Sequence, residues 1–335
     1  MNDALLLSVV VIGRNEGDRL RRCLESVAAM RRVGFGSETI YVDSGSTDAS
    51  LALAAGLGVR TIALNAVRPT AALGRNAGWR AARGELVLFL DGDTVLDPRF
   101  VAGSLGEFAK ARTAIVWGHR RELFPQATLY NRVLDLDWIY ATGLTAFCGG
   151  DALFRRKVLE ATGGFDETLI AGEEPELCRR ILALGLQIMH VDLPMTGHDL
   201  AMTRFGQYWK RATRAGHAFA EVSGRFAGTA NPFWLTESQG NRKRGTVLAT
   251  VLPAALIVCL WLRSVWPLVV VVALLILLAV RTAWKARWKS ADRVALLLYG
   301  VHSHFQQVPI LVGQVQFWMN QRRGKQAGLV EYKGR

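Results

Sequence analysis

The sequence predicts an α/β protein with a mostly parallel sheet flanked by helices, followed by transmembrane or interfacial helices. Short apolar segments of strand character alternate with helical patterns through the first part of the chain, which is typical of βαβ units. One segment, Leu86–Leu90, is apolar without interruption, as expected of a strand buried on both faces of a sheet. Apolar residues also concentrate between about 246 and 280, which explains much of the 50% hydrophobic content and indicates membrane helices.

The strand and helix patterns can be assigned in order. The expected strands are Leu5–Ile12, Thr39–Val42, Val59–Leu64 and Leu86–Leu90. The expected helices between them are Arg19–Met30, Asp48–Leu57 and Ala71–Ala82. The first apolar run has no basic residue before it and no small-residue cleavage site after it, so it is interpreted as a strand rather than a secretory leader.

Charge and cysteine content narrow the class of protein. The net charge of +13 favours acidic partners, such as nucleotide phosphates or an anionic membrane surface. We find no nucleic-acid-binding module in the sequence, so nucleic acid is not an expected partner. The four cysteines have no paired spacing, which indicates reduced thiols in a cytosolic setting rather than a disulfide framework or a zinc site.

Two carboxylates follow the predicted central strand. Asp91 and Asp93 are separated only by Gly92, at the end of the strand where open α/β sheets bind their ligands. Such a pair suits Mg²⁺ or Mn²⁺ carrying a diphosphate, although an ordinary Asp-Gly turn would look the same. Asp43 also ends its strand without beginning a helix, which favours contact with a ligand. No glycine-rich dinucleotide fingerprint and no Gly-Lys-Ser/Thr phosphate loop is present.

Seven motifs resemble family 2 glycosyltransferases, which have the GT-A fold. Each motif is weak alone, but together they occur in the family's order and spacing over roughly residues 5–220. They are Ser8–Glu16, Val42–Asp48, Gly74–Gly78, Asp91–Asp93, Phe147–Arg156, Gly163–Glu167 and Gly172–Arg180. The resemblance implies transfer of a sugar from a nucleoside diphosphate sugar.

The resemblance assigns roles in donor binding. It implies that Asp93 contacts the metal and that Asp91 lies toward the ribose and the metal. Asp43 matches the acid that meets the nucleobase or ribose, and Glu16 lies in the same nucleotide pocket. Arg75 fits an anion contact beside the diphosphate, with a surface arginine at a helix start as the alternative.

A base for the acceptor hydroxyl is implied at Glu173-Glu174. The family carries a Glu-Asp pair before a helix, so Glu174 takes the Asp position, and whether Glu173 or Glu174 is the base stays open. Both acids would also favour the amino terminus of the expected helix Glu176–Leu184, without any catalytic role. Gly150 and Asp151 belong to the acceptor-side loop that the resemblance implies.

Two further features are less specific indications of a site. His198 follows the expected strand Gln187–Val191 and, by resemblance, would complete the metal shell with Asp93. Lys210, Arg211 and Arg214 lie at helical spacing. They are candidates for contact with the diphosphate or an acidic lipid head group, or they form a solvated helix face.

The apolar tail predicts a transmembrane hairpin. Thr246–Leu262 and Val265–Val280 carry no charge, and Arg263 lies between them. A single helix over this stretch would be about 50 Å long, well beyond the roughly 30 Å of a hydrocarbon core. A hairpin instead places Arg263 at the far surface and both flanking basic clusters on the cytoplasmic side. The alternative is a buried helical hairpin in a soluble domain.

The remaining tail, Val294–Trp318, is interrupted by His and Gln residues and predicts an interfacial helix. The expected domains are a GT-A catalytic domain at 1–225, a basic linker at 226–245, the hairpin at 246–281, and an interfacial helix with a basic tail at 282–335.

These features predict a membrane-anchored, inverting, metal-dependent glycosyltransferase of hexosyltransferase type, with its catalytic domain on the cytosolic side of the inner membrane. The donor would be a UDP- or GDP-sugar and the acceptor a lipid-linked saccharide in polysaccharide or glycolipid assembly. A polyprenyl phosphate is the alternative acceptor. An alternative of another class is a nucleotide-sugar-binding membrane protein without activity, which the Glu at position 174 would favour.

Overall fold

The computed structural model describes residues 5–325 and divides into two compact units. The first unit contains the described residues up to Leu123 together with Trp138–Leu200. The second contains Phe124–Asp137 and the described chain from Ala201 onward.

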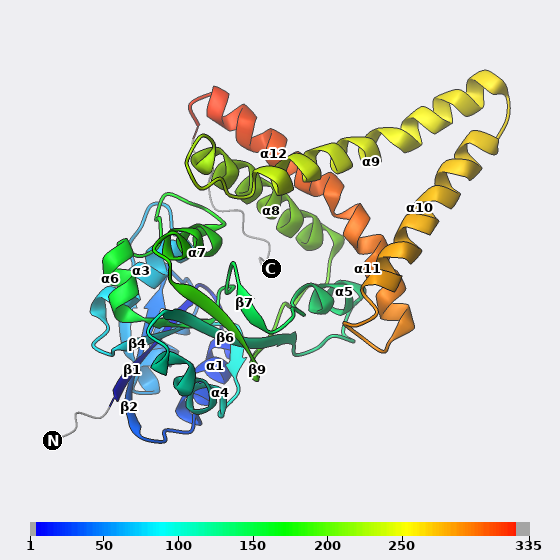
Figure 1. The fold of residues 1–335 in the computed structure, drawn as a ribbon. Helices are drawn as coiled ribbons and strands as arrows, with labels where there is room; N and C mark the ends of the chain where they lie inside the picture. Colours follow the sequence, from blue (N-terminus) through cyan, green and yellow to red (C-terminus); the bar gives the residue numbers. More distant parts are fainter. Residues whose placement is uncertain (1–4, 326–335) are drawn as a thin grey trace. The chain divides into compact units, whose positions relative to one another are not determined.

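The first unit is built on a mixed sheet of nine strands among its described residues (Figure 1). The strand order is β3-β2-β1-β4-β8-β6-β9-β5, and β7 pairs with β9. The strands are β1 (Leu5–Gly13), β2 (Phe35–Asp43), β3 (Arg60–Ala63), β4 (Leu86–Asp91), β5 (Thr94–Leu96), β6 (Thr113–Glu122), β7 (Gly143–Thr145), β8 (Ala152–Arg155) and β9 (Gln187–His198). All four predicted strands of the first part are present.

The sheet is parallel where helices connect its strands and mixed elsewhere. β1 pairs in parallel with both β2 and β4, and β2 pairs in parallel with β3. Beyond β4, only β6 and β9 are parallel, whereas β8 runs antiparallel to β4 and β6. The expectation of a mostly parallel sheet therefore holds for the first half only. β5 follows β4 after only two residues, which is too short for the crossover that parallel pairing of these two strands would need. β5 pairs antiparallel with β9.

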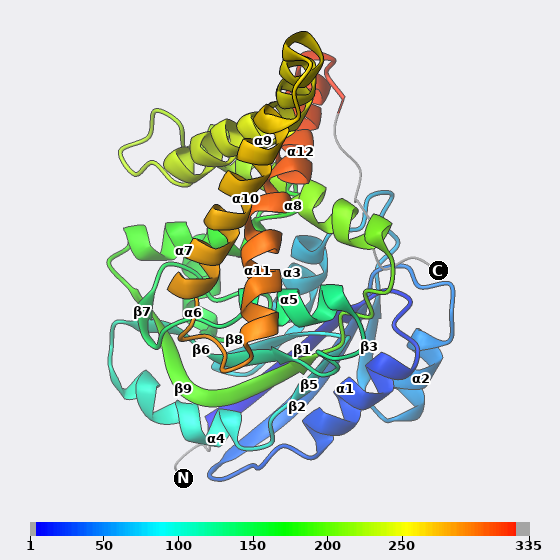
Figure 2. The same ribbon diagram turned by 90° about the vertical axis from the view of Figure 1, so that its right-hand side faces the viewer.

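Helices cover the sheet of the first unit (Figure 2). They are α1 (Asp18–Ala28), α2 (Ser50–Gly56), α3 (Ala71–Ala81), α4 (Phe100–Ser104), η1 (Leu105–Ala109), α6 (Arg156–Thr162) and α7 (Glu173–Ala183). β4 lies in the core, with Val87–Leu90 fully buried, as its unbroken apolar sequence predicts. The helix α7 begins three residues earlier than expected, so both candidate bases belong to its first turn.

The second unit is helical. It contains α5 (Leu129–Asp137), α8 (Phe205–Phe226), α9 (Leu235–Leu262), α10 (Trp266–Lys285), α11 (Arg293–Phe305) and α12 (Gln307–Arg322). These limits differ from the predicted domain ranges, because α8 belongs to the helical unit and α9 begins inside the expected linker.

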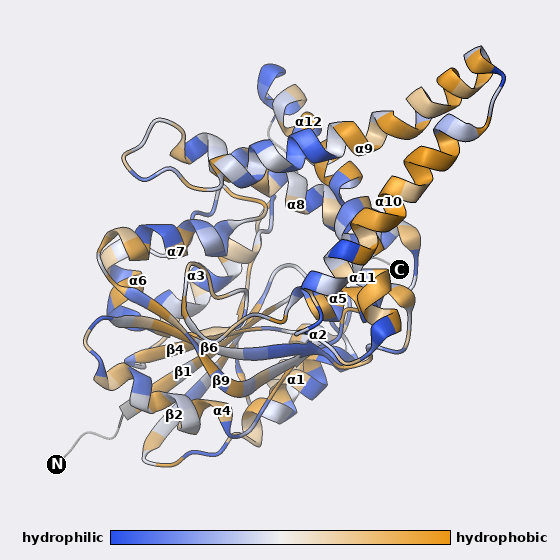
Figure 3. Cartoon of the chain, turned by 45° about the vertical axis from the view of Figure 1, so that its right-hand side comes forward, coloured by the Kyte–Doolittle hydropathy of each residue, from blue (hydrophilic) through white to orange (hydrophobic). Residues whose placement is uncertain are grey.

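The predicted apolar hairpin is formed by α9 and α10, which are both long and apolar enough to cross a membrane. Arg263 ends α9 in the left-handed backbone region, at φ 48°, and the chain turns there into α10. Figure 3 shows apolar residues along both helices up to this turn. Only 11% of the most apolar 18-residue window of each helix is buried, which argues against the alternative of a buried hairpin in a soluble domain.

The segment expected to form one interfacial helix instead forms two, α11 and α12, separated at Gln306. Several of its polar residues face the interior of the unit. Gln314 is fully buried and donates to the carbonyl oxygen of Ser238 at 2.9 Å. These polar residues lie in contacts between helices. The hydrophobic period of a sequence does not distinguish a polar face buried in this way from one that faces water.

A buried polar network joins α5, α8 and α11. His302 lies between Asp137 Oδ2, at 3.1 Å from its Nε2, and the Tyr208 hydroxyl, at 2.8 Å from its Nδ1. Burial acts to raise the pKa of Asp137, but His302, and more weakly Arg211 and Lys289, lower it below the ordinary range. The carboxylate is therefore held in its charged form.

Candidate active site

Parallel pairing brings three strand ends to one edge of the sheet. In the register of the central strands, Gly13 pairs with Asp43 and Ile12 pairs with Asp91. The amide of Gly92 donates to the carbonyl oxygen of Ile12 at 2.7 Å, which fixes the turn after β4 against β1. The loops after β1, β2 and β4 therefore share the edge where ligands bind in such sheets.

Asp43 organises the loop that follows β2. Its Oδ1 accepts hydrogen bonds from the Tyr41 hydroxyl at 2.9 Å and the Ser46 hydroxyl at 2.5 Å. Its Oδ2 accepts from the amides of Gly45 and Ser46 at 3.1 and 2.8 Å. Asp43 is 3% exposed, and its hydrogen bonds order this loop. Contact of Asp43 with a nucleotide stays a prediction. Glu16, in the neighbouring loop, forms an ion pair of 3.0 Å with Arg19.

Arg75 joins two of the predicted site acids. From α3, its guanidinium contacts Asp91 Oδ1 at 2.9 Å and Glu173 Oε1 at 2.7 Å, and its side chain is 3% exposed. Burial acts to lower the pKa of Arg75, but the two carboxylates raise it further above its ordinary value. The alternative of a surface arginine is therefore wrong. The ion pairs link α7 to the end of β4 through one buried cation.

Gly150 and Asp151 lie against the turn that carries Asp91. The carboxylate of Asp151 accepts from the Asp91 amide at 3.0 Å and from the Thr196 hydroxyl at 2.8 Å. Burial raises the pKa of Asp151 to about 6, although Arg120 opposes the shift. A Cβ atom at Gly150 would lie 2.8 Å from Asp91 Oδ2, so a side chain at this position would have to displace the Asp91 carboxylate.

Asp91, Asp93 and His198 form a candidate metal centre. One ligand atom from each lies within 4.8 Å of the others, and His198 Nε2 is 3.4 Å from Asp93 Oδ1. Asp93 and His198 are buried, whereas the side chain of Asp91 is 32% exposed. Two carboxylates and an imidazole at this spacing are a donor set that can hold a divalent cation.

The two adjacent glutamates of α7 have different partners. Glu173 is buried and bound to Arg75. Glu174 is half-buried, and its Oε1 accepts from the amide of Cys148 at 2.6 Å and from the thiol of Cys178 at 3.0 Å. Its other oxygen, Oε2, takes part in neither bond.

Lys210, Arg211 and Arg214 lie on α8, in the helical unit, so they are not part of the cluster described above. Arg211 contributes to the field that lowers the pKa of Asp137 in that unit. Contact of the three cations with a diphosphate or a lipid head group stays a prediction.

Sequence reasoning missed Arg120. This residue of β6 lies 5.8 Å from the Trp138 ring, and Trp138 in turn lies 4.9 Å from the imidazole of His198. Arg120 also opposes the rise in the pKa of Asp151, which places its charge beside the candidate site. The run His119-Arg120-Arg121-Glu122 directly after an apolar strand was the available signal.

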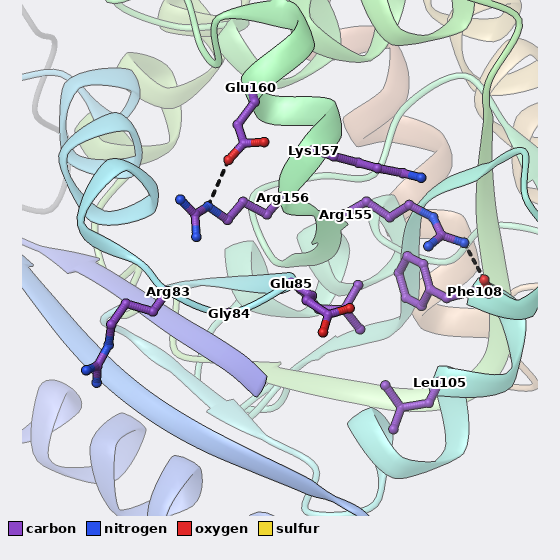
Figure 4. Close-up of a pocket in the computed structure, with 10 residues that line it drawn as sticks. Arg83, Gly84, Glu85, Leu105, Phe108, Arg155, Arg156, Lys157 and Glu160 are labelled. Carbon is purple, nitrogen blue, oxygen red and sulfur yellow. Dashed lines mark hydrogen bonds and ion pairs between the residues drawn. The ribbon is translucent and has the colours of Figure 1, made fainter. Parts of the chain in front are cut away.

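A separate surface pocket lies at the other end of β4 (Figure 4). Leu86, the first residue of β4, lines it together with Arg155, which ends the antiparallel strand β8. The guanidinium of Arg155 donates to the carbonyl oxygens of Thr113, at 2.7 Å, and Phe108. One basic residue of the pocket lining, Arg155, therefore holds backbone groups in place. The pocket is distinct from the sheet edge that carries Asp91.

Known glycosyltransferases resemble this chain in sequence. Residues 8–163 match the model of glycosyl transferase family 2. A pre-mycofactocin glycosyltransferase of Mycobacterium tuberculosis is 26% identical over 207 residues, which are 58% of this chain and 42% of that protein. The succinoglycan biosynthesis protein ExoO of Rhizobium meliloti is 31% identical over 205 residues, which are 53% of this chain and 56% of that protein. The match therefore spans about half the length of these relatives.

Solved structures share the fold. The mannosyltransferase PcManGT of Pyrobaculum calidifontis, in complex with GDP-Man and Mn²⁺, superposes with a TM-score of 0.62 at 19% identity, covering 94% of this chain and 87% of that one. Residues 1–349 of S. aureus TarS, in complex with UDP-GlcNAc, give a TM-score of 0.51 at 14% identity, covering 96% and 93%. The predicted resemblance is thus confirmed: residues 8–163 match the family 2 glycosyltransferase model, and the fold is GT-A.

Proposed function

We propose that this chain is a membrane-anchored, cation-dependent, inverting hexosyltransferase that moves a sugar from a nucleoside diphosphate sugar to a lipid-linked saccharide. The observation that carries the proposal is the cluster of Asp91, Asp93 and His198, which Arg75 connects to Glu173 at the start of α7. A donor site and a base are both needed for inversion, and this edge of the sheet supplies residues for each.

The candidate metal centre would hold Mn²⁺ or Mg²⁺ through Asp93 and His198, with Asp91 as a third ligand. A divalent ion there would neutralise charge on the departing diphosphate. Arg75 holds the Asp91 carboxylate in position through an ion pair of 2.9 Å. Glu16 and Asp43, from the neighbouring loops, would meet the nucleoside.

Glu174 is the better candidate for the base. A base must present a carboxylate oxygen to the acceptor hydroxyl, and a carboxylate held by a buried guanidinium has less of its surface available for that contact. Glu173 is held in this way by Arg75, whereas Glu174 Oε2 lies outside the bonds to Cys148 and Cys178. We therefore assign Glu174 to the proton and Glu173 to positioning Arg75.

Membrane anchoring and the acceptor rest on the second unit and on one relative. The apolar faces of α9 and α10 are exposed, and a bilayer would cover them at little cost. Basic residues flank the hairpin at both ends, which favours a topology with these ends on the cytosolic side of the inner membrane. The name of ExoO links a relative to polysaccharide assembly, which favours a lipid-linked saccharide over a polyprenyl phosphate.

The test is transfer of radiolabelled sugar by the purified full chain in lipid nanodiscs with Mn²⁺. UDP- and GDP-sugars are supplied in turn, with either a lipid-linked saccharide extract or a polyprenyl phosphate as acceptor. Labelled lipid-linked saccharide is the expected product. Labelled polyprenyl phosphate alone would overturn the acceptor assignment.

Two variants separate catalysis from binding. Glu174→Gln is expected to keep donor affinity within about threefold and to lose at least 100-fold in turnover, in the range that a positioned base contributes. The exposed Glu25→Gln removes the same charge from α1 and is expected to retain activity. Donor binding without transfer to any acceptor would instead favour the non-catalytic alternative.

A further inference from the structure

Cys148, Glu174 and Cys178 form a second cluster of potential metal ligands within the first unit. Their ligand atoms lie within 4.8 Å of one another. The two sulfur atoms are 3.6 Å apart, and Cys178 Sγ is 3.0 Å from Glu174 Oε1. Both thiols are fully buried. Cys148 lies just before β8 and Cys178 lies on α7, so 29 residues of intervening sequence hide the pairing.

The spacing matches a soft metal better than a disulfide. Two thiolates on one tetrahedral Zn²⁺, with Zn–S bonds of about 2.3 Å, lie about 3.8 Å apart. A disulfide needs about 2.05 Å between the sulfur atoms, much less than the distance observed here, and both cysteines are free. The observed 3.6 Å between the sulfur atoms is close to the roughly 3.8 Å expected for two thiolates on one Zn²⁺.

We propose that Cys148, Cys178 and Glu174 bind a soft divalent cation of the Zn²⁺ class, at a site separate from the Asp91–Asp93–His198 centre. The two sites differ in donor chemistry. Two sulfurs select Zn²⁺ or Cd²⁺, whereas the carboxylates and imidazole of the other centre suit Mn²⁺ or Mg²⁺. The first unit would thus contain two metal sites that select different cations.

Binding exchanges protons for the metal. Burial raises the pKa of Cys148 to about 12 and raises that of Cys178 well above its ordinary value, so both thiols are neutral without a metal. In that state the Cys178 thiol donates to Glu174, as the structure shows. The cation would form two sulfur bonds and one carboxylate bond while two thiol protons leave to solvent.

The site has a consequence for activity that rests on the proposed function. A cation bound to Glu174 Oε1 would occupy the carboxylate that the proposed function assigns to the proton of the acceptor hydroxyl. Zn²⁺ is therefore expected to inhibit transfer while donor binding continues.

The binding experiment uses the reduced full chain in detergent, with excess Mg²⁺ to occupy hard-ligand sites, and titrates Cd²⁺ while following thiolate-to-metal absorption. One equivalent is expected in the wild type. Cys148→Ser and Cys178→Ser should each lose at least tenfold in Cd²⁺ affinity. Cys259→Ser, which changes a cysteine of α9, should keep it.

A measurement on the wild-type chain does not depend on whether the variants fold. Zn²⁺ should raise the thermal midpoint of the wild-type chain, since a ligand bound only to the folded state stabilises it. An absent absorption band, or a band that persists in the double variant Cys148→Ser/Cys178→Ser, would overturn the proposal.

Inhibition is tested separately, in the transfer assay with Mn²⁺ in excess. Zn²⁺ is expected to inhibit the wild type, and the Cys178→Ser variant should need at least tenfold more Zn²⁺ for half inhibition. Cd²⁺ binding without any transfer activity would leave the site standing and refute the proposed function. Transfer that Zn²⁺ inhibits equally in the wild type and the variant would refute the link to Glu174.

Discussion

The imidazole of His198 lies 3.4 Å from the carboxylate of Asp93, although 104 residues separate them in the sequence. The register of β5 and β9 produces this contact, because Thr94 pairs with His198 and the amide of Asp199 donates to the carbonyl oxygen of Asp93 at 2.9 Å. Backbone pairing thus positions both side chains before any ligand binds, which lowers the entropy cost of binding.

The first prediction concerns this pair. Asp93→Asn and His198→Ala are each expected to weaken Mn²⁺ binding at least tenfold, because each removes one of three donor groups. Isothermal titration of Mn²⁺ in the presence of a nucleoside diphosphate measures the effect. Asp192→Asn, on the same strand β9 but 89% exposed, serves as the control. Mn²⁺ affinity unchanged in both site variants would contradict a metal centre here.

The second prediction concerns Arg75. Arg75→Met should destabilise the first unit by about 3–5 kcal/mol, because it leaves the Asp91 and Glu173 carboxylates without their buried cation. Thermal unfolding of the detergent-solubilised chain reports the loss. Arg80→Met, which removes a half-exposed arginine from the same helix, should cost under about 1 kcal/mol. Equal losses for the two variants would show that the buried ion pairs have no special weight.

Gly150 gives a third prediction. Gly150→Ala should reduce donor affinity and turnover at least tenfold, because the added methyl group would displace Asp91 Oδ2 and the guanidinium of Arg75. Gly106→Ala, where no atom lies within 4 Å of the added group, is the matched control. Donor titration and single-turnover rates separate the two effects. Normal kinetics for Gly150→Ala would place the donor elsewhere.

The fourth prediction is a pH dependence in the helical unit. The pKa of Asp137 is lower in the folded chain than in the unfolded one, so its stabilising contribution is complete above about pH 4 and is lost as pH falls further. Asp137→Asn should cost about 1–3 kcal/mol near neutral pH, and the difference from wild type should shrink below pH 4. Urea unfolding at a series of pH values measures this difference. A difference that stays constant with pH would mean that the charge of Asp137 does not stabilise the fold.

The fifth prediction concerns membrane topology. In inverted and right-side-out vesicles, a membrane-impermeant maleimide should label Ser264→Cys from the side opposite to Thr229→Cys. Ser264 lies in the turn between α9 and α10, and Thr229 is exposed between α8 and α9. The three cysteines of the first unit are buried and should label little. Labelling of both positions from one side would refute a spanning hairpin.

Local sequence determined much of the first unit. The unbroken apolar run of β4 and the polar residues after β1 and β2 were enough to predict a sheet edge that carries Asp43, Asp91 and Asp93. Parallel pairing follows from the intervening helices, so strand ends that are distant in sequence had to meet. The hairpin was equally legible, because length and charge alone decide whether a helix suits a bilayer.

The contacts between individual side chains were not predictable from the sequence. Arg75 contacts two carboxylates with which no local pattern pairs it, and Gln314 is buried within a segment that was expected to form an interfacial helix. Hydrophobic period tells which face of an element is covered, but not which group covers it. Such contacts depend on pairs of elements that no local pattern connects.

By itself, then, the sequence determined the α/β order, the carboxylate-bearing sheet edge and the apolar hairpin, since each follows from the spacing of residues within one element. Only the tertiary structure decided that His198 meets Asp93, that Glu173 and Glu174 have different partners, and that Cys148 lies beside Cys178. Strand register and helix packing set these contacts, and both are properties of the whole fold.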